Sequence, residues 1–453
     1  MNFYKFIIAR LNGRDIEKEF DYYLGLVKKG IAGFIVFGGE LNTVRQGIKE
    51  LQKEADNRLI IASDLEQGLG QQLEGGTIFP PAMAIASAIK KMQDARCRMQ
   101  DARISTQELK ILRSVFKAVA VEARYAGINT IFAPVLDINT NPKNPIISTR
   151  AFGEDPESVS FFGCEMIKIF QSYGITACGK HFPGHGDTET DSHIKLPKIK
   201  KDIKALSKTE LAPFRNAVKA GVKMIMLGHL NVPALDPSGI PVSLSQKAVS
   251  YLRNKLGFKG VIITDAMNMG GIGKYSEEKA SLMALNAGVD ILLHPADPDK
   301  VVAYLEGKDA GCRMQDARCG IQDTRFKRTK TESSVPDFSE NKRLAEKITK
   351  MAIKIDGRLE PLHFFAPLLI ILSDDADKKG KTFYAGLKSR YRSLKQLDIK
   401  QGEDLKLGSV PRGRELIVAV FSSIRAWKGG ASPWLLKCIT ELKDKAEIFI
   451  SFG

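Results

Sequence analysis

Residues 174–193 read Gly-Ile-Thr-Ala-Cys-Gly-Lys-His-Phe-Pro-Gly-His-Gly-Asp-Thr-Glu-Thr-Asp-Ser-His. The first six residues are typical of a short strand. The rest is polar, is interrupted by Pro183, Gly184 and Gly186, and lacks the apolar period of 3.6 or 2 that a packed helix or strand needs. A polar loop that leaves the C-terminal end of a strand is where active sites lie in α/β barrels. The stretch therefore predicts a loop that carries chemistry.

Strand-like apolar runs alternate with amphipathic helical stretches along the rest of the chain, a pattern that predicts a parallel sheet with helical crossovers. The predicted strands are 6–9, 33–37, 59–63, 130–136, 174–178, 223–227, 260–264 and 289–293. Predicted helices include 14–29, 156–173, 202–220, 244–256, 276–287 and 338–355. Eight strands of this kind predict a closed barrel.

A second α/β unit follows, with predicted strands at 367–372 and 415–421 and a last strand, Ile-Phe-Ile-Ser-Phe-Gly, at 448–453. No helix follows that strand to cover the sheet, so we expect only part of a doubly wound domain. The predicted fold class is α/β: a TIM (β/α)8-type barrel over 1–356, followed by a truncated α/β sandwich domain over 357–453.

Copies of Met-Gln-Asp-Ala-Arg indicate two inserts, at about 90–104 and 308–336. The copies lie at 92–96, 99–103 and 314–318, with a decayed copy at 321–325. Nothing apolar recurs in them, which favours solvated surface over a solenoid. The inserts carry a sizeable part of the formal net charge of +16, so this charge predicts no nucleic-acid partner for the core.

The composition, with 43% apolar and 26% charged residues among 453, is that of a globular protein. The chain has no membrane-length apolar run, no recognisable signal peptide and no cysteine spacing typical of disulfides. We therefore expect a cytoplasmic protein without a membrane partner, a monomer or weak homo-oligomer.

Polar residues follow the predicted strands one after another. They are Asp64, Glu66, Asp137, Lys180, His181, His229, Asp265 and His294. A single acid at a strand end, such as Glu66 or Asp137, is more often a loop cap than a catalyst. The joint appearance of all these residues on one rim predicts an active site.

Asp265 stands out because the apolar run Gly-Val-Ile-Ile-Thr places its carboxylate at the rim on a rigid strand. Glycoside cleavage needs such an anion below the anomeric carbon and a proton donor beside the departing oxygen. His193 can supply the proton, and Asp191 can orient and charge-stabilise its imidazole. Neutral imidazole, unlike carboxylate, does not repel an incoming anion.

Several motifs carry a resemblance to a known family. They are Lys-His-Phe-Pro-Gly-His-Gly-Asp at 180–187 with Asp-Ser-His at 191–193, Ser-Thr-Arg-Ala-Phe-Gly at 148–153, Phe-Ala-Pro-Val-Leu-Asp at 132–137 and Ile-Thr-Asp at 263–265. On these motifs the chain resembles the family 3 glycoside hydrolases of the bacterial β-N-acetylglucosaminidase type. The resemblance covers residues 1 to about 306 and the 338–355 helix, and more loosely the C-terminal unit.

The resemblance implies a retaining exo-glycosidase that hydrolyses terminal β-linked N-acetylglucosamine through a glycosyl-enzyme intermediate, without metal or organic cofactor. The carbohydrate would come from muropeptides or chitooligosaccharides, as in peptidoglycan recycling. Asp265 matches the nucleophile, and His193 with Asp191 matches the acid/base dyad. The matched substrate-binding residues are Asp64, Arg150, Lys180, His181, His229 and Met269.

One substrate-binding position departs from the family pattern, because Gln72 stands where the family usually has an arginine. Losing a cationic donor to hydroxyls costs roughly 1.5–3 kcal/mol of binding. A catalytically impaired sugar-binding homologue is therefore one alternative. A metal-dependent hydrolase is another, since His181, His185, Asp187, Asp191 and His193 are residue types that bind Zn²⁺.

Overall fold

The computed structural model describes most of the chain. The described residues are 1–96, 106–141, 144, 146–188, 196–308, 335–352, 368–373, 381–391, 393–400, 416–421, 433–442 and 448–452. The chain divides into two compact units, Met1–Ile353 and Lys354–Gly453. The insert copies at 99–103, 314–318 and 321–325 lie outside the described residues, whereas the copy at 92–96 ends a helix.

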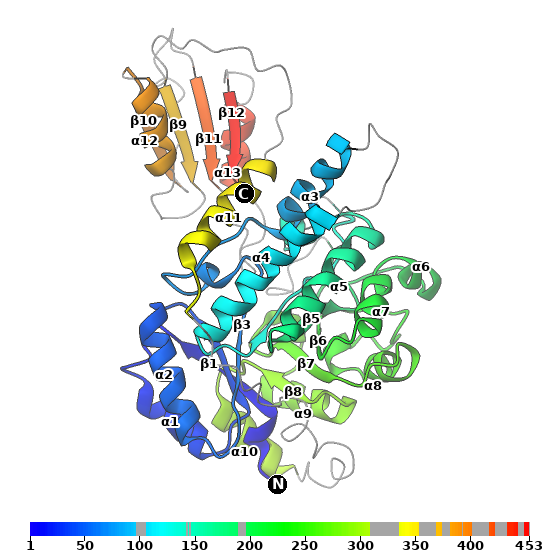
Figure 1. Cartoon of the computed structure of the whole chain (residues 1–453). Coiled ribbons are helices and arrows are strands. Elements are labelled where there is room, and N and C mark those ends of the chain that lie inside the picture. The colour runs from blue at the N-terminus through cyan, green and yellow to red at the C-terminus, as the bar shows by residue number, and fades with distance from the viewer. Residues whose placement is uncertain are drawn as a thin grey trace. The chain divides into compact units, whose positions relative to one another are not determined.

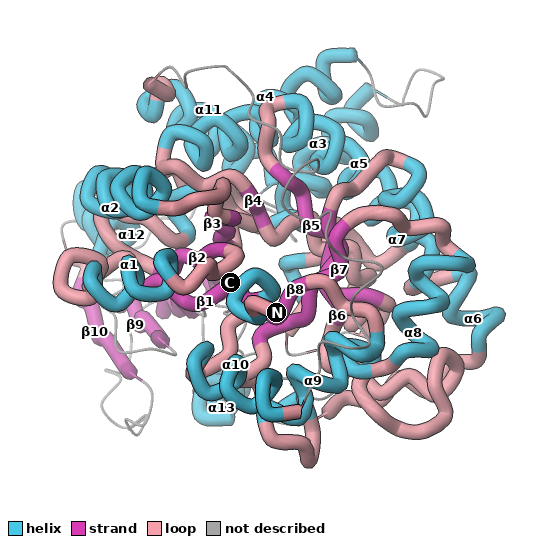
Figure 2. Tube along the Cα trace, turned by 90° about the horizontal axis from the view of Figure 1, so that it is seen from below, coloured by secondary structure: helices cyan, strands magenta, loops and turns pink. Residues whose placement is uncertain are grey.

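A closed barrel of eight parallel strands forms the centre of the first unit (Figures 1 and 2). Each strand pairs with the next along the chain, and the ring closes between the last strand and the first. The predicted TIM-type barrel is thus confirmed. Its strands are β1 (Ile7–Asn12), β2 (Gly33–Phe37), β3 (Ile60–Ser63), β4 (Thr130–Ile131), β5 (Thr176–Phe182), β6 (Met224–Leu227), β7 (Val261–Ala266) and β8 (Ile291–Leu293).

Helices surround the barrel (Figure 2). They are α1 (Phe20–Lys28), α2 (Leu41–Glu54), α3 (Ala82–Arg96), α4 (Thr106–Tyr125), α5 (Pro156–Ser172), α6 (Ile203–Lys208), α7 (Leu211–Lys219), α8 (Gln246–Ser250), α9 (Glu277–Ala287), α10 (Pro298–Gly307) and α11 (Phe338–Ala352). Among the described helices, none combines the length and the apolarity needed to cross a bilayer.

Two helix predictions were wrong in their extent. The predicted helix over 202–220 is two helices, α6 and α7, because Thr209 leaves the helical region at φ −107°, ψ −92°. The predicted helix over 14–29 begins only at Phe20. Before it, the Asn12 side chain donates to Asp15 and holds a turn, a local side-chain interaction that competes with helix formation.

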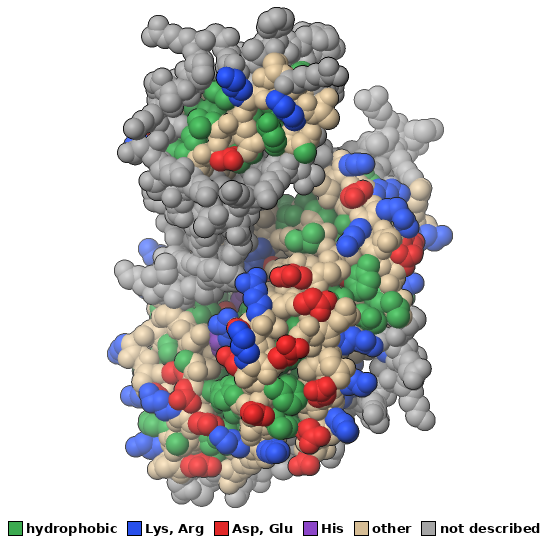
Figure 3. All heavy atoms as spheres, turned by 90° about the vertical axis from the view of Figure 1, so that its left-hand side faces the viewer, with side chains coloured by type: hydrophobic (Ala, Val, Ile, Leu, Met, Phe, Trp, Pro, Cys, Tyr) green, Lys and Arg blue, Asp and Glu red, His purple; other side chains and the backbone are tan. Residues whose placement is uncertain are grey.

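The strands carry apolar side chains on both faces, as buried parallel strands do. One set fills the barrel interior and includes Ile8, Ile35, Ala62 and Cys178. The other set packs against the surrounding helices. On the face drawn in Figure 3, basic and acidic side chains are interspersed among neutral and apolar ones.

The second unit contains a four-stranded parallel sheet in the order β10 (Lys395–Lys400), β9 (Leu368–Ser373), β11 (Leu416–Phe421), β12 (Ile448–Phe452). Residues of α12 (Lys381–Arg390) pack on one apolar face and residues of α13 (Pro433–Leu442) on the other. This arrangement confirms the predicted α/β sandwich. The sequence prediction missed β10 because four of the six residues in Lys-Gln-Leu-Asp-Ile-Lys are polar, as suits an edge strand.

Candidate active site

Three predicted site residues lie at the C-terminal ends of alternate barrel strands: Asp64 after β3, Lys180 in β5 and Asp265 in β7. The residues two positions earlier, Ala62, Cys178 and Ile263, belong to the interior cluster. Because side chains alternate along a strand, the three polar residues form the next interior layer, at the mouth. The structure therefore brings them to one end of the barrel.

Lys180 is the centre of a buried ion-pair network. Its Nζ lies 2.7 Å from Asp64 Oδ1 and 2.6 Å from Glu66 Oε1, although the side chain is only 2% exposed. Glu66 also accepts two hydrogen bonds from Arg150, at 2.9 Å from Nε and 2.7 Å from Nη2. Charge-assisted pairs of this geometry fix both partners in place. The network therefore fixes the positions of the Lys180 and Asp64 side chains at the mouth of the barrel.

The pKa values of the network follow from its charges. Burial alone would raise the pKa of Glu66, but Arg150 and Lys180 outweigh it and hold the pKa well below 4.5. Burial would likewise lower the pKa of Lys180, and the carboxylates of Asp64 and Glu66 keep it above 10.5. Glu66, Arg150 and Lys180 are therefore charged near neutral pH.

Replacing Glu66 by Ala is expected to lower the free energy of unfolding by about 3–5 kcal/mol, because two buried cations lose their shared anion. Chemical denaturation measures the effect, with Glu17→Ala as the control, since Glu17 is an exposed carboxylate outside the network. Equal stability of the Glu66 variant and the wild type would show that the network contributes nothing to folding.

Asp137 organises the loop that follows β5. It is fully buried and accepts hydrogen bonds from the backbone N–H groups of His181 and His185, at 3.1 Å and 2.7 Å. Its Oδ2 lies 2.7 Å from His181 Nδ1. Burial raises its pKa, but His181 outweighs burial and the net shift is downward. Asp137 therefore fixes the imidazole of His181 through Nδ1.

His185 lies beside His181, with ring centroids 6.1 Å apart. The Thr188 hydroxyl donates to the His185 carbonyl, so His185 Nδ1, 2.8 Å from that hydroxyl, is assigned as the donor. Its buried Nε2 has no hydrogen-bond partner among the described residues. Burial lowers the pKa of His185 to about 4, so the ring is neutral at physiological pH.

Acid is expected to destabilise the fold through His185. Below its ordinary pKa of 6.5 the unfolded side chain takes up a proton, whereas the folded one stays neutral down to about 4. The free energy of unfolding therefore falls as pH drops from 6.5 toward 4. In His185→Asn, which keeps a donor for Thr188 but does not titrate, the fall between pH 7 and pH 4.5 should be smaller. Denaturation at both pH values tests this, and an equal fall in both proteins would contradict it.

The backbone at Asp265 is held from two directions. The Ala266 N–H donates to Asp265 Oδ1 at 2.8 Å, and the Ala266 carbonyl accepts from the Met269 N–H at 3.1 Å. His229 Nε2 lies 3.0 Å from the same carbonyl, and its Nδ1 lies 2.6 Å from Ser243 Oγ. His229 is fully buried. Its contacts therefore support the end of β7 and the position of the Asp265 carboxylate.

The remaining predicted site residues divide into two groups. Asp191 and His193 lie outside the described residues. Gln72 is half-buried, and its Nε2 donates to the Asp64 backbone carbonyl at 3.4 Å. Gln72 therefore lies next to the residue whose side chain meets Lys180.

The residues proposed for a metal site have other partners where they are described. Asp187 lies 3.1 Å from Lys201 Nζ, and the Nδ1 atoms of His181 and His185 contact Asp137 and Thr188. Within the described ranges, no three His, Cys, Asp or Glu side chains are grouped as metal ligands.

Glu66 and Asp137, taken singly, have the sequence pattern of ordinary loop caps, and Arg10 lies outside the predicted strand at 6–9. The structure gives both acids specific cationic or imidazole partners. The predicted first strand ended at Ala9, whereas β1 continues to Asn12. Arg10 therefore lies within the strand. The sequence signal for this longer strand is the alternation of apolar Ala9 and Leu11 with polar Arg10 and Asn12.

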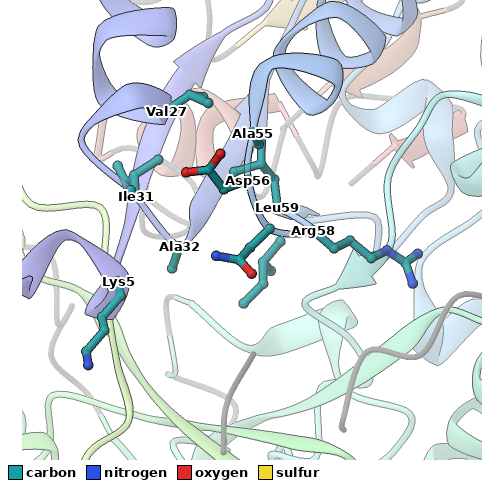
Figure 4. Close-up of a pocket in the computed structure, with 11 residues that line it drawn as sticks. Lys5, Val27, Ile31, Ala32, Ala55, Asp56, Arg58 and Leu59 are labelled. Carbon is teal, nitrogen blue, oxygen red and sulfur yellow. The ribbon is translucent and has the colours of Figure 1, made fainter. Parts of the chain in front are cut away.

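A cavity at the opposite end of the barrel is separate from this site (Figure 4). Its lining residues lie before β1 and β2 and at the start of β3, and they include Lys5, Ala32, Asp56 and Leu59. Figure 4 shows the Lys5 and Arg58 side chains extending away from each other. In barrels of this kind the N-terminal end contributes stability rather than catalysis.

Comparison with known proteins identifies the family. Residues 18–325 match the Glycosyl hydrolase family 3 N-terminal domain. The chain belongs to this family. The predicted resemblance is thus confirmed over residues 18–325, which include strands β2 to β8.

Individual relatives agree with this assignment. The chain is 34% identical over 333 residues to "Beta-hexosaminidase A" of Pseudoalteromonas piscicida, covering 63% of the chain and 53% of the relative. It is 32% identical over 282 residues to "Beta-hexosaminidase" of Neisseria meningitidis serogroup C, covering 61% and 74%. A solved family 3 β-N-acetylglucosaminidase from Paenibacillus sp. str. FPU-7 aligns with 99% of the chain and 89% of its own, with a TM-score of 0.77 and 27% identity. The chain spans about half the length of the first of these curated relatives.

Proposed function

We propose that this family 3 chain is a retaining exo-glycosidase that removes terminal β-linked N-acetylglucosamine. The observation that carries the proposal is the layer of Asp64, Lys180 and Asp265 at the catalytic end of the barrel. This layer places one carboxylate at the end of β7 and a fixed cation–anion pair, Lys180 with Asp64, at the ends of β5 and β3. The names of the similar proteins, β-hexosaminidase and β-N-acetylglucosaminidase, support N-acetylglucosamine as the sugar.

In the proposed first step, an Asp265 carboxylate oxygen bonds to the anomeric carbon and the bond to the leaving-group oxygen breaks. His193 gives its proton to that oxygen, so the leaving group departs as a neutral alcohol. In the second step His193 takes a proton from water, whose oxygen displaces Asp265 and regenerates the carboxylate. Two inversions retain the anomeric configuration.

Substrate recognition rests on the charged groups around the mouth. Asp64 and Lys180 would hold ring hydroxyls directly, since ionised groups form strong hydrogen bonds to them. Arg150 would act mainly through Glu66, and Asp137 through the His181 imidazole. We propose muropeptides or chitooligosaccharides as the natural source of the sugar, and the cytoplasm as the location.

The test is turnover of 4-nitrophenyl β-N-acetylglucosaminide compared with the matching β-glucoside and β-xyloside, with and without phosphate. We expect the N-acetylglucosaminide to have the highest kcat/KM. Saturable N-acetylglucosamine binding without release of nitrophenol would favour the sugar-binding homologue. Loss of turnover after chelation, with near-stoichiometric zinc in the purified protein, would favour the metal-dependent hydrolase.

A further inference from the structure

Arg10 faces the interior of the barrel at its catalytic end. Ile8, two residues earlier on β1, belongs to the interior cluster, and Arg10 pairs in register with Ile35 of β2, another interior residue. Neighbouring residues in register on parallel strands point to the same face of the sheet. Arg10 is nevertheless exposed. The Arg10 side chain therefore lies at the solvent-accessible mouth of the barrel and is not covered by core residues.

Arg10 completes the polar layer described above. Barrel interiors are filled in layers of four side chains from alternate strands, and β1, β3, β5 and β7 supply Arg10, Asp64, Lys180 and Asp265. Around the mouth, positive and negative groups alternate. The pKa of Cys178, one layer below, is raised by burial and by Asp64 and Asp265 and lowered by Lys180, consistent with these three charges lying above one thiol.

The guanidinium of Arg10 differs from the other cations of the site in its partners. Its central carbon lies 5.3 Å from the centroid of the Phe37 ring, and that ring lies 5.9 Å from His294. Lys180 and Arg150 both bind carboxylates, whereas Arg10 forms no ion pair with any residue that the structure describes. Burial, together with the charge of Arg10, lowers the pKa of His294 to about 4, so this imidazole does not add a competing cation at neutral pH.

We propose that Arg10 is a specificity-determining residue that binds an anionic group, a phosphate or carboxylate, of the ligand held in the mouth. The inference rests on the proposed function, which places the sugar over this layer. A guanidinium already stacked on an aromatic ring keeps its planar donor edge in one orientation, and that edge matches two oxygens of an anion. Arg10 lies across the ring of strands from Lys180, so the anionic group would lie on the side of the sugar away from Lys180.

Calorimetric titration of the full chain tests the proposal without depending on turnover. The ligands are N-acetylglucosamine, N-acetylglucosamine 6-phosphate and inorganic phosphate, and the proteins are wild type, Arg10→Met and Arg45→Met. Arg45 is the matched control, because it is an exposed arginine stacked on an aromatic ring, Tyr125, at 4.3 Å, on the outer helix α2. Turnover of the neutral 4-nitrophenyl N-acetylglucosaminide by the wild type, measured in parallel, tests the proposed function separately.

We expect the wild type to bind the 6-phosphate more tightly than the neutral sugar, and Arg10→Met to reduce that preference about tenfold or more. If Arg10→Met loses affinity for N-acetylglucosamine 6-phosphate but not for inorganic phosphate, the bound anion is a group carried by the sugar. If it loses affinity for both ligands equally, a free anion binds at the same site. The proposal is overturned if the wild type binds neither N-acetylglucosamine 6-phosphate nor inorganic phosphate more tightly than N-acetylglucosamine. It is also overturned if Arg10→Met keeps the wild-type preference for the anionic ligand, or if Arg45→Met loses that preference as much as Arg10→Met does.

Discussion

Replacing Asp265 by Asn is expected to lower kcat for 4-nitrophenyl β-N-acetylglucosaminide by about 10³-fold or more, because an amide cannot form the glycosyl ester. The fold should persist. The Asn oxygen can still accept from the Ala266 N–H, and the His229 contact involves the Ala266 carbonyl, which the substitution leaves in place. Steady-state kinetics and the circular dichroism spectrum of the variant measure both parts of this expectation.

Asp21→Asn is the matched control for this variant, since Asp21 is an exposed carboxylate on α1. It should turn over substrate as the wild type does. Wild-type turnover by Asp265→Asn would show that another group is the nucleophile, whatever the position of Asp265 at the mouth.

Replacing His193 by Ala is expected to lower kcat/KM for a substrate with a poor leaving group about 10²- to 10⁴-fold, the usual contribution of a positioned acid. The loss should shrink for a 2,4-dinitrophenyl glycoside, because that leaving group departs without a proton. The measurement is the slope of log kcat/KM against leaving-group pKa, which should become steeper in the variant.

The slope distinguishes a proton donor from a residue that only binds or shapes the loop. A binding role would lower kcat/KM equally for every leaving group. Unchanged slopes in the wild type and His193→Ala would therefore exclude His193 as the acid, and would direct attention to the other ionisable groups of the mouth.

The strand pattern predicted the barrel because each buried parallel strand is a short apolar run between loops and amphipathic helices, a signal carried by contiguous residues. The same reasoning located Asp64, Lys180 and Asp265, since each directly follows or ends such a run. The predicted strand was too short where polar residues followed the apolar run. The strand prediction closed at Ala9, and Arg10 was left outside it.

Ion-pair partners could not be predicted, because they are set by the way the loops fold over the barrel. Arg150 and Glu66 are 84 positions apart in the sequence, and Lys180 and Asp64 are 116 apart. No local pattern joins such residues. The break between α6 and α7 is a further example, since Thr209 occurs in a continuous amphipathic pattern and departs from helical geometry only in the folded chain.

The most direct test of the account is to trap the glycosyl-enzyme. The wild type would be treated with 5-fluoro-N-acetylglucosaminyl fluoride, which forms the intermediate faster than it hydrolyses, and the protein digested for mass spectrometry. We predict one added 5-fluoro-N-acetylglucosaminyl group, on the peptide that contains Asp265, and none in Asp265→Asn. A label on a different carboxylate, or full inactivation with no label on the Asp265 peptide, would contradict the central claim that Asp265 attacks the sugar.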